Sequence, residues 1–301
     1  MAGVEEADLR RSAFGDQPGA NVWQATRSPD PRTRWLAAVT LGAQGHYAAA
    51  ATLLDDLRHT PDATIASLAL STRASHCRQL GNHAGARHRD AAALGRVRTG
   101  TSTDPDGVDP AGARTDALLG LAADAIGKGD LVEARRLHAR ADPATWRTRV
   151  RHGWVAAEIE LAAGRPDHAV QPAEAAKREA DGRDSIRHQV KSDLVLGTAL
   201  VVWGTPEGLT RGVELVECDL NHSVTHGLFS LIWPSALVLV GHDPTVASDV
   251  IDRAMQALSC VLRRADPISR RVAFESPWVP TWLLRSGEPP NADPQTNFLT
   301  D

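Results

Sequence analysis

One short pattern recurs along this chain: a glycine, four variable residues, and then an alanine or another apolar residue. Successive glycines lie 36, 48, 35, 40 and 37 positions apart. A spacing of this length fits a unit of two helices, so the pattern predicts an array of stacked helical repeats. The six occurrences are at 45–50, 81–86, 129–134, 164–169, 204–209 and 241–246.

A small residue stands seven positions before most of these glycines. It allows the first helix of a unit to approach the second closely. The glycine then ends the first helix, because the left-handed conformation of a helix C-terminus costs glycine little. The small residues are Ala38, Ala74, Ala122, Ala157 and Gly197, and Pro234 replaces them in the sixth unit.

Helix starts are marked independently, by an Asp or a Thr that directly precedes a proline. The side-chain oxygen accepts from free N–H groups of the first helical turn, and proline at the first position lacks the N–H that would be unpaired. The apolar residues are mostly Ala and Leu, which favour helices over strands. We therefore expect an all-α fold. The expected first helices are 31–44, 62–80, 111–128, 144–163, 186–203 and 227–240, and the second helices are 47–58, 83–96, 131–140, 167–180, 206–219 and 244–264.

The spacing resembles the tetratricopeptide repeat, a helix–turn–helix of about 34 residues with small residues at these places and a glycine in its turn. The resemblance extends over residues 31–260. The closing proline of the family pattern is not regularly placed, and the last two units lack the later Ala. The resemblance implies a right-handed α-α superhelix (solenoid) of about six helix pairs. The first unit matches best, with Trp35, Ala38, Gly45, Tyr47 and Ala50.

The remaining segments suggest how the chain is organised. The interval between the second and third glycines exceeds the first interval by 12 residues, 48 against 36, and the surplus falls on a polar stretch rich in Gly, Asp and Pro. Such a stretch predicts a mobile loop. A repeat array also needs a cover over its terminal unit. We expect a partly disordered extension at 1–30, the array at 31–264 with a loop at 99–112, an irregular cap at 265–285, and a disordered tail at 286–301.

Charge and hydropathy exclude some classes of protein. The net charge of -4 argues against a nucleic-acid partner, which would favour a basic surplus. The most apolar stretches, 194–203 and 228–240, are shorter than the roughly 20 residues that span a bilayer. Three widely spaced cysteines suggest free thiols in a reducing compartment. We expect a cytoplasmic protein without membrane insertion.

Motifs for chemistry are absent from the sequence. It has no G-x-S-x-G elbow, phosphate-binding loop, dinucleotide fingerprint, H-E-x-x-H pair or C-x-x-C spacing. Cys218, His222 and His226 lie at four-residue steps, which would align them as metal ligands on one helical face. However, Asn221 and the residues after it predict a turn that breaks this alignment. We expect no metal, no cofactor and no enzymatic activity.

A concave groove is the better candidate site, because arrays that resemble this one bind extended peptides on the face of their first helices. An aromatic anchor beside Arg or Lys suits an acidic segment. Two alternatives stay open: the tryptophans lie in the core, and the basic residues belong to ordinary solvated faces. The candidate partner-binding residues are Arg32, Trp35, Ser75, Arg78, Arg151, Trp154, Glu158 and Lys191, with Asp116 on the same face.

Three functions remain. The leading hypothesis is an adaptor or scaffold that holds a peptide or a partner helix in the groove. The alternative is a ligand-sensing regulatory module of a signalling or transcription system. An enzyme would need acidic or histidine side chains converging in the groove, and only Glu158 and Asp116 approach that arrangement. Self-association through the apolar segment 274–284 is a further possibility.

Overall fold

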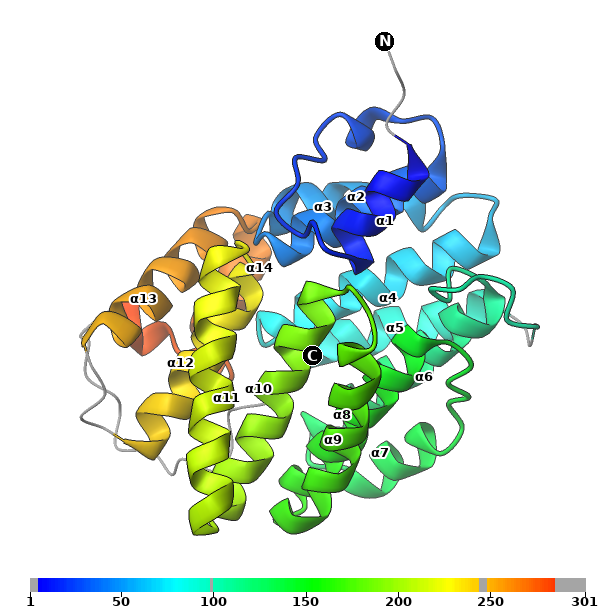
Figure 1. The fold of residues 1–301 in the computed structure, drawn as a ribbon. Coiled ribbons are helices and arrows are strands. Elements are labelled where there is room, and N and C mark those ends of the chain that lie inside the picture. Colours follow the sequence, from blue (N-terminus) through cyan, green and yellow to red (C-terminus); the bar gives the residue numbers. More distant parts are fainter. Residues whose placement is uncertain (1–4, 98–99, 244–247, 285–301) are drawn as a thin grey trace.

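The structure is a computed structural model that describes residues 5–97, 100–243 and 248–284. Within these residues every regular element is a helix: fourteen α-helices and two short 3₁₀ helices, without a strand. The predicted all-α class is therefore confirmed (Figure 1). The predicted tail at 286–301 lies outside the described residues.

The observed helices follow the predicted pairs closely. The first helices are α2 (Pro31–Ala43), α4 (Ala63–Gln79), α6 (Pro110–Ile126), α8 (Trp146–Ala162), α10 (Ile186–Trp203) and α12 (Phe229–His242). The second helices are α3 (Tyr47–Leu57), α5 (His83–Arg96), α7 (Leu131–His138), α9 (Pro166–Asp181), α11 (Pro206–Thr225) and α13 (Ser248–Arg263). The remaining elements are α1 (Glu6–Phe14), α14 (Pro267–Glu275), η1 (Ala25–Arg27) and η2 (Thr281–Leu284).

The turns inside the pairs depend on glycine, as the sequence predicts. Five of the six predicted turn glycines have a positive φ, between 68° and 77°. The sixth, Gly241, is an exception because α12 continues to His242, and the register predicted for the last unit is therefore wrong. The five are Gly45, Gly81, Gly129, Gly164 and Gly204.

Close helix packing explains the small residues seven positions earlier. The four alanines at these places are fully buried. Gly197 of α10 faces Gly212 of α11, and a Cβ atom at Gly197 would lie 2.9 Å from the Gly212 carbonyl oxygen. A larger side chain would therefore force α10 and α11 apart.

Four of the predicted caps are confirmed, because the Asp or Thr side chain accepts from a backbone N–H of the first turn. They are Asp30, Asp109, Thr205 and Asp266. Two others are displaced: Asp62 caps α4 instead of Thr60, and Thr145 caps α8 instead of Asp142. In both cases the helix begins two or three residues after the proline, so proline lies in the preceding turn.

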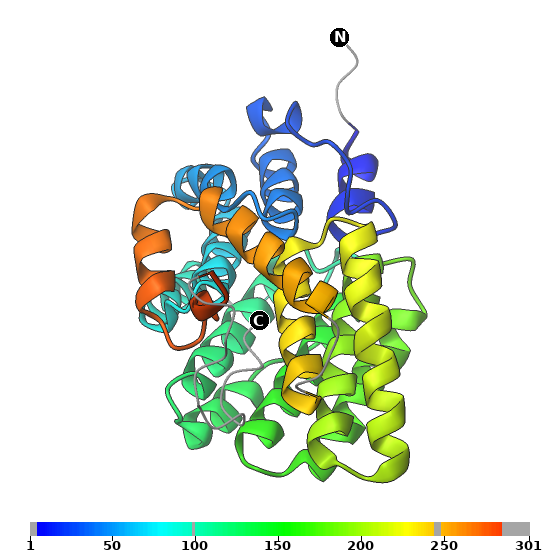
Figure 2. The same cartoon turned by 90° about the vertical axis from the view of Figure 1, so that its left-hand side faces the viewer.

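The helices form two layers. Each helix packs on the next along the chain, and the first helices α2, α4, α6, α8 and α10 also pack on one another in order. They form the inner layer, and the second helices lie outside them (Figures 1 and 2). The sequence predicts close contacts within a pair, whereas the contacts between first helices give the array its curvature.

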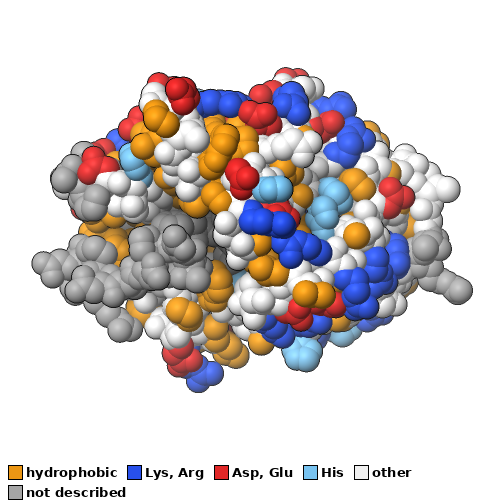
Figure 3. All heavy atoms as spheres, turned by 90° about the horizontal axis from the view of Figure 1, so that it is seen from below, with side chains coloured by type: hydrophobic (Ala, Val, Ile, Leu, Met, Phe, Trp, Pro, Cys, Tyr) orange, Lys and Arg blue, Asp and Glu red, His pale blue; other side chains and the backbone are white. Residues whose placement is uncertain are grey.

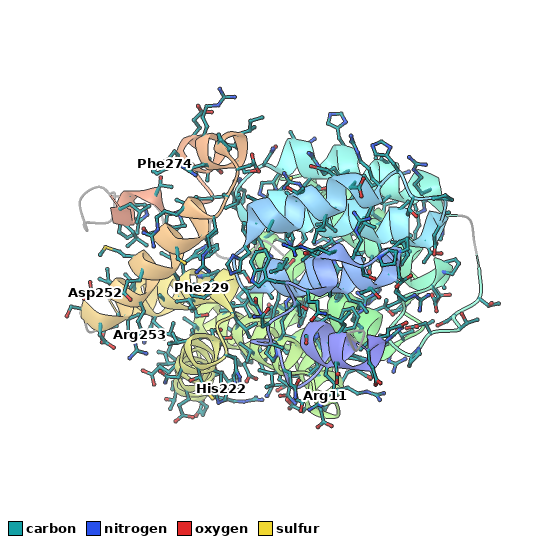
Figure 4. All side chains as sticks on the ribbon, turned by 90° about the horizontal axis from the view of Figure 1, so that it is seen from above. Arg11, His222, Phe229, Asp252, Arg253 and Phe274 are labelled. Atoms are coloured by element: carbon teal, nitrogen blue, oxygen red, sulfur yellow. The ribbon has the colours of Figure 1, made fainter. Side chains whose placement is uncertain are left out.

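The last units return to the first ones. Helix α12 contacts both α10 and α2, the backbone N–H of Ala48 donates to the carbonyl of Arg264 at 2.8 Å, and the Arg264 guanidinium donates to the Gln44 carbonyl at 3.3 Å. One apolar cluster combines Tyr47 from the first unit with Val261 from the last. Viewed from above, Phe229 lies beside α2 and α3, at this junction (Figure 4). The array is therefore closed into a ring.

The C-terminal segment differs from the irregular cap that the sequence predicts. Residues 267–275 form the regular helix α14, and the segment after it reaches the second unit. Ser276 donates its hydroxyl to the carbonyl of Gly81 at 3.4 Å, and the Trp278 ring centroid lies 5.0 Å from that of His83. The segment therefore joins the two ends of the array instead of covering the last helices alone (Figure 2).

The N-terminal residues pack against the ring. Helix α1 contacts α2 and α10, and it buries Leu9, Ala13 and Phe14. The loop at 100–109 is held by Asp109, whose carboxylate accepts from the backbone N–H groups of Thr103 and Asp104 at 2.8 and 2.9 Å. Arg10 of α1 donates to Asp104 and Asp106 of this loop, so the helix and the loop are joined to each other.

Candidate functional site

Two neighbouring inner helices present paired cations to the inside of the ring. Arg147 and Arg151 lie four positions apart on α8, and Arg187 and Lys191 lie four apart on α10. Residues at this spacing share one face of a helix. Because α8 packs on α10, the two faces are adjacent, and all four side chains border one interior space, here called the inner cavity.

Asp116 of α6 positions the two arginines of α8. Arg147 donates to both carboxylate oxygens, with Nη2–Oδ2 at 2.8 Å and Nη1–Oδ1 at 3.3 Å. Arg151 donates Nη1 to Oδ1 at 2.6 Å. Arg147 also donates Nε to the carbonyl of Asp106 at 2.6 Å. These charge-assisted bonds are sheltered from water, so they hold the guanidinium groups in place.

Aromatic rings form a second wall. The His188 ring stacks on that of Trp154, with centroids 5.6 Å apart and planes at 17°, and Trp146 meets His188 edge-on at 4.9 Å. The Lys191 Nζ lies 4.9 Å from the Trp154 ring centroid, a cation–π geometry. The Trp154 indole donates its Nε1 proton to Ser192 at 2.9 Å. Its polar edge is thus satisfied in the core, while the ring borders the inner cavity.

The opposite wall comes from α2 and α4. Trp35 donates its indole proton to the Thr72 hydroxyl at 3.0 Å, and Ser75 lies one turn further along α4. The His76 ring stacks on Tyr47 with centroids 5.0 Å apart. Burial, together with three nearby arginines, lowers the pKa of His76 to about 3. This histidine is therefore neutral at physiological pH, and its buried Nδ1 has no hydrogen-bond partner among the described residues.

These walls leave an inner cavity of about 70 Å³. It is bordered by α2, α4, α6, α8 and α10, with Phe14 of α1 closing it at one side. One water-sized probe needs about 10–15 Å³, so the space holds a few water molecules or one small polar group.

The charge around the inner cavity is predominantly positive. Four cations border it, whereas Asp116 is the one carboxylate among the described lining residues. Even with the buried Glu158, one turn beyond Trp154, cations outnumber carboxylates four to two. Burial lowers the pKa of His188 well below its ordinary value, and all four cations lower it further. Burial is the first cause of this shift, and the cations act in the same direction, so His188 stays neutral beside them.

The outer surface differs from this interior. On the underside of the molecule, basic side chains are interspersed with acidic and hydrophobic ones (Figure 3). The cations at the inner cavity are therefore a local concentration and do not continue a uniformly basic surface on that face.

The structure brings together most of the residues that the sequence predicts for the groove. Five of the eight partner-binding candidates border the inner cavity, and so does Asp116. Both tryptophans are also largely buried. They therefore belong to the core and border the inner cavity at the same time. The five are Trp35, Ser75, Arg151, Trp154 and Lys191.

The placement predicted for Arg78 is wrong. Its side chain is 1% exposed and lies between two fully buried carboxylates, with Nη1 at 2.6 Å from Asp90 and 3.2 Å from Asp124. Burial raises the pKa of both aspartates, and Arg78 opposes this effect. Arg78 is thus an internal ion-pair residue that joins α4, α5 and α6, and it cannot meet a partner in a groove.

Two further predictions need correction. Arg32 lies at the start of α2, outside the lining of the inner cavity. There it donates to the Val108 carbonyl at 3.3 Å and to the Asp104 carboxylate at 3.5 Å. Glu158 is 2% exposed and does not border the inner cavity. Both residues lie on first helices. Only part of each of these two helices borders the inner cavity, so a place on a first helix is not enough to reach it.

Sequence reasoning missed eight residues of the described lining, among them Phe14, Arg147, Arg187 and His188. The two arginines carry a signal, because each stands four positions before a predicted site cation. Phe14 carries none, since it lies in a segment that the repeat pattern does not include.

The predicted turn at Asn221 is also wrong. Helix α11 continues to Thr225, so Cys218 and His222 do share one face, with Sγ and Nδ1 3.7 Å apart. Nevertheless, within the described residues no three His, Cys, Asp or Glu side chains are placed to hold a metal ion.

Comparison with known proteins adds no assignment: no family model matches the chain, and no curated protein is significantly similar to it. Across the part of the chain that the structure describes, no helix combines the length and apolar character needed to cross a bilayer. The candidate function therefore depends on the geometry of the inner cavity.

Proposed function

We propose that this protein is a binding module for a small anionic ligand, a phosphate or a carboxylate, which is held in the inner cavity. The observation that carries the proposal is the group of four cations on α8 and α10 around a partly enclosed space with a single bordering carboxylate among the described residues. This is the ligand-sensing function that the sequence offers as its alternative.

The chemistry of the walls fits an oxyanion. Arg151 and Arg187 offer planar forks of donors that suit two oxygens of one phosphate or carboxylate, and Lys191 supplies a compact charge. The aromatic rings beside them lower the local dielectric, so each charge interaction is stronger than at the surface. The fixed pair between Arg147 and Asp116 limits the movement of the wall during binding.

Size favours a small ligand over an extended peptide. A space of about 70 Å³ accepts one phosphate or carboxylate group, whereas a peptide groove would have to run openly along the inner layer. An adaptor function remains the natural expectation for an open array of tetratricopeptide-like pairs. We still propose such pairs, in a right-handed superhelix, because the turn glycines and small residues recur at the expected positions.

The proposed function is non-catalytic. Asp116, the carboxylate at the inner cavity, is held by two arginines, and Nδ1 of the neutral His188 lies 2.7 Å from the Ser185 hydroxyl. Neither group is arranged as a free base beside the cations. We further propose that the protein acts in the cytoplasm, independently of nucleic acid. Self-association through 274–284 is less favoured, since most of this segment packs within the chain, although Phe274 points outward (Figure 4).

Calorimetric titration with inorganic phosphate, and separately with acetate, tests the function and distinguishes the two anions. We expect Arg151→Met and Arg187→Met each to weaken binding about tenfold or more, because each removes a charged hydrogen-bond donor. Arg253→Met, at an exposed cation paired with Asp249 on α13, is the matched control and is expected to bind like the wild type. Absence of binding of both anions, or equal loss in the control, would contradict the proposal.

A further inference from the structure

A second, larger hollow lies outside the inner cavity, between the end of α1, the 100–109 loop and the start of α8. It has a volume of about 730 Å³ and is bordered by the loop residues 102–106, the start of α8, Arg149, and the α9–α10 turn at Arg183 and Asp184. We call it the outer hollow. Phe14 borders both the outer hollow and the inner cavity. Its side chain is therefore the lining residue that the two spaces share.

Phe14 is held by the walls of the inner cavity. Its ring centroid lies 5.9 Å from that of Trp35 and 6.5 Å from that of His188, so it bridges α2 and α10. The Arg147 guanidinium lies over the same ring at 5.4 Å. Just after the ring, the Gly15 carbonyl accepts from the backbone N–H of Ile186 at 3.2 Å. The end of α1 is thus anchored to three inner helices.

The middle of α1 is joined to the 100–109 loop by an ion-pair latch at Arg10. Arg10 donates to Asp104 at 2.6 Å and to Asp106 at 2.5 Å. Asp106 also accepts the indole proton of Trp146 at 3.0 Å, and its carbonyl accepts from Arg147. One loop residue therefore contacts both the latch of α1 and a cation at the inner cavity.

Helix α1 is a separable element. It has nine residues, and an isolated helix of this length is marginal in water. Its stability depends on the few side chains that it buries in the ring and on the Arg10 latch. Such elements open locally at a lower cost than global unfolding.

We infer that α1 is a gate, and that an anion passes between the outer hollow and the inner cavity when α1 releases Phe14. This inference rests on the proposed function for the identity of the ligand, but the movement of the gate is measurable without any ligand. A gate changes the rates of entry and exit more than the affinity, because both directions cross the same barrier.

A cysteine at the inner cavity reports on the gate directly. In a Cys218→Ser, Cys260→Ser background, Ser75→Cys places a thiol in the cavity lining, while the native Cys77 stays buried with its pKa raised by burial. The probe is iodoacetamide, and alkylation is followed by mass spectrometry. We expect Phe14→Ala to accelerate alkylation of residue 75 about tenfold or more, and Arg10→Met to accelerate it severalfold.

The control distinguishes gating from general loosening of the fold. Leu258→Ala removes a fully buried side chain of α13 that lines neither the inner cavity nor the outer hollow. An unchanged alkylation rate in Phe14→Ala, or an equal increase in Leu258→Ala, would overturn the gate.

Stopped-flow binding of inorganic phosphate completes the test. We expect Phe14→Ala to raise the association and dissociation rates together, about tenfold each, with the Kd changed less than about threefold. Unchanged rates would overturn the gate even if phosphate binds. Faster alkylation without any phosphate binding would retain the gate and remove the proposed ligand, so the two proposals fail separately.

Discussion

Two charged clusters lie on the inner helices, and they are built in opposite ways. Around Arg78, one arginine faces two fully buried carboxylates, and the helices close tightly on the group: a Cβ atom at Gly120 would lie 2.3 Å from the Asp90 carboxylate. At the inner cavity, four cations and one carboxylate border a space, and that carboxylate pairs with two of the cations, Arg147 and Arg151. The first cluster holds helices together, whereas the second borders the space in which we propose that an anion binds.

The difference shows that a cation on the inner face is not enough to define a site. Arg78 and Arg151 both lie on the first helices of their units, and the sequence assigns both to the groove. The neighbouring helix decides between them, because α5 supplies Asp90 to Arg78, whereas α6 supplies an aspartate that Arg151 shares with Arg147.

The largest expected effect is on stability, at Arg78. Arg78→Met leaves two buried carboxylates without their cation, and we expect the free energy of unfolding to fall by about 3–5 kcal/mol. Arg151→Met is the matched change in the other cluster. It leaves Asp116 paired with Arg147, so we expect a loss of about 1–2 kcal/mol. Chemical denaturation measures both, and an equal loss in the two variants would contradict the distinction.

The next effect is on the pH dependence of stability. Burial and the neighbouring Asp124 raise the pKa of Asp90 above its ordinary value. A raised pKa in the folded state means that stability is fully present below the ordinary aspartate pKa, about 3.9, and is lost as the pH rises through the folded value. The free energy of unfolding should therefore fall from about pH 4 towards neutrality. Asp90→Asn should flatten this slope, whereas the exposed Asp252→Asn on α13 should keep it. Equal slopes in denaturation curves would refute the expectation.

The smallest effect is on affinity, at the inner cavity. Asp116 competes with any bound anion for the two arginines, so we expect Asp116→Asn to tighten phosphate binding about three- to tenfold. Asp124→Asn, the same change in the closed cluster, should leave the affinity unchanged. Titration calorimetry compares the two, and weaker binding in Asp116→Asn would show that the carboxylate organises the site instead of competing for it.

Much of the fold follows from local signals in the sequence. The turn glycines, the small residues before them and the helix caps each depend on the conformation of a few consecutive residues. A short pattern therefore predicts the helices and their pairing. Where the prediction fails, contacts between helices are the cause: α11 continues through Asn221 while it packs on α10 and α12.

The site was predictable only in part, because it depends on contacts between units. The inner-layer register placed Trp35 and Trp154 on the correct face, since both lie ten positions before their turn glycines, and it placed Arg151 there one turn earlier on the same helix as Trp154. Whether a side chain borders the inner cavity or pairs with a neighbouring side chain depends on the curvature of the array. The repeat pattern does not specify that curvature. Phe14 was missed for the same reason, as its role comes from a contact between α1 and three distant helices.

The junction of the first and last units has a consequence for the history of the chain. An open array gains or loses a unit by duplication or deletion without disturbing distant neighbours. Here an added pair would separate Ala48 from Arg264, and a deleted pair would make these ends collide. The number of helix pairs is thus locked by the contact between the ends, and change in such a protein must proceed by substitution within units instead of by adding copies.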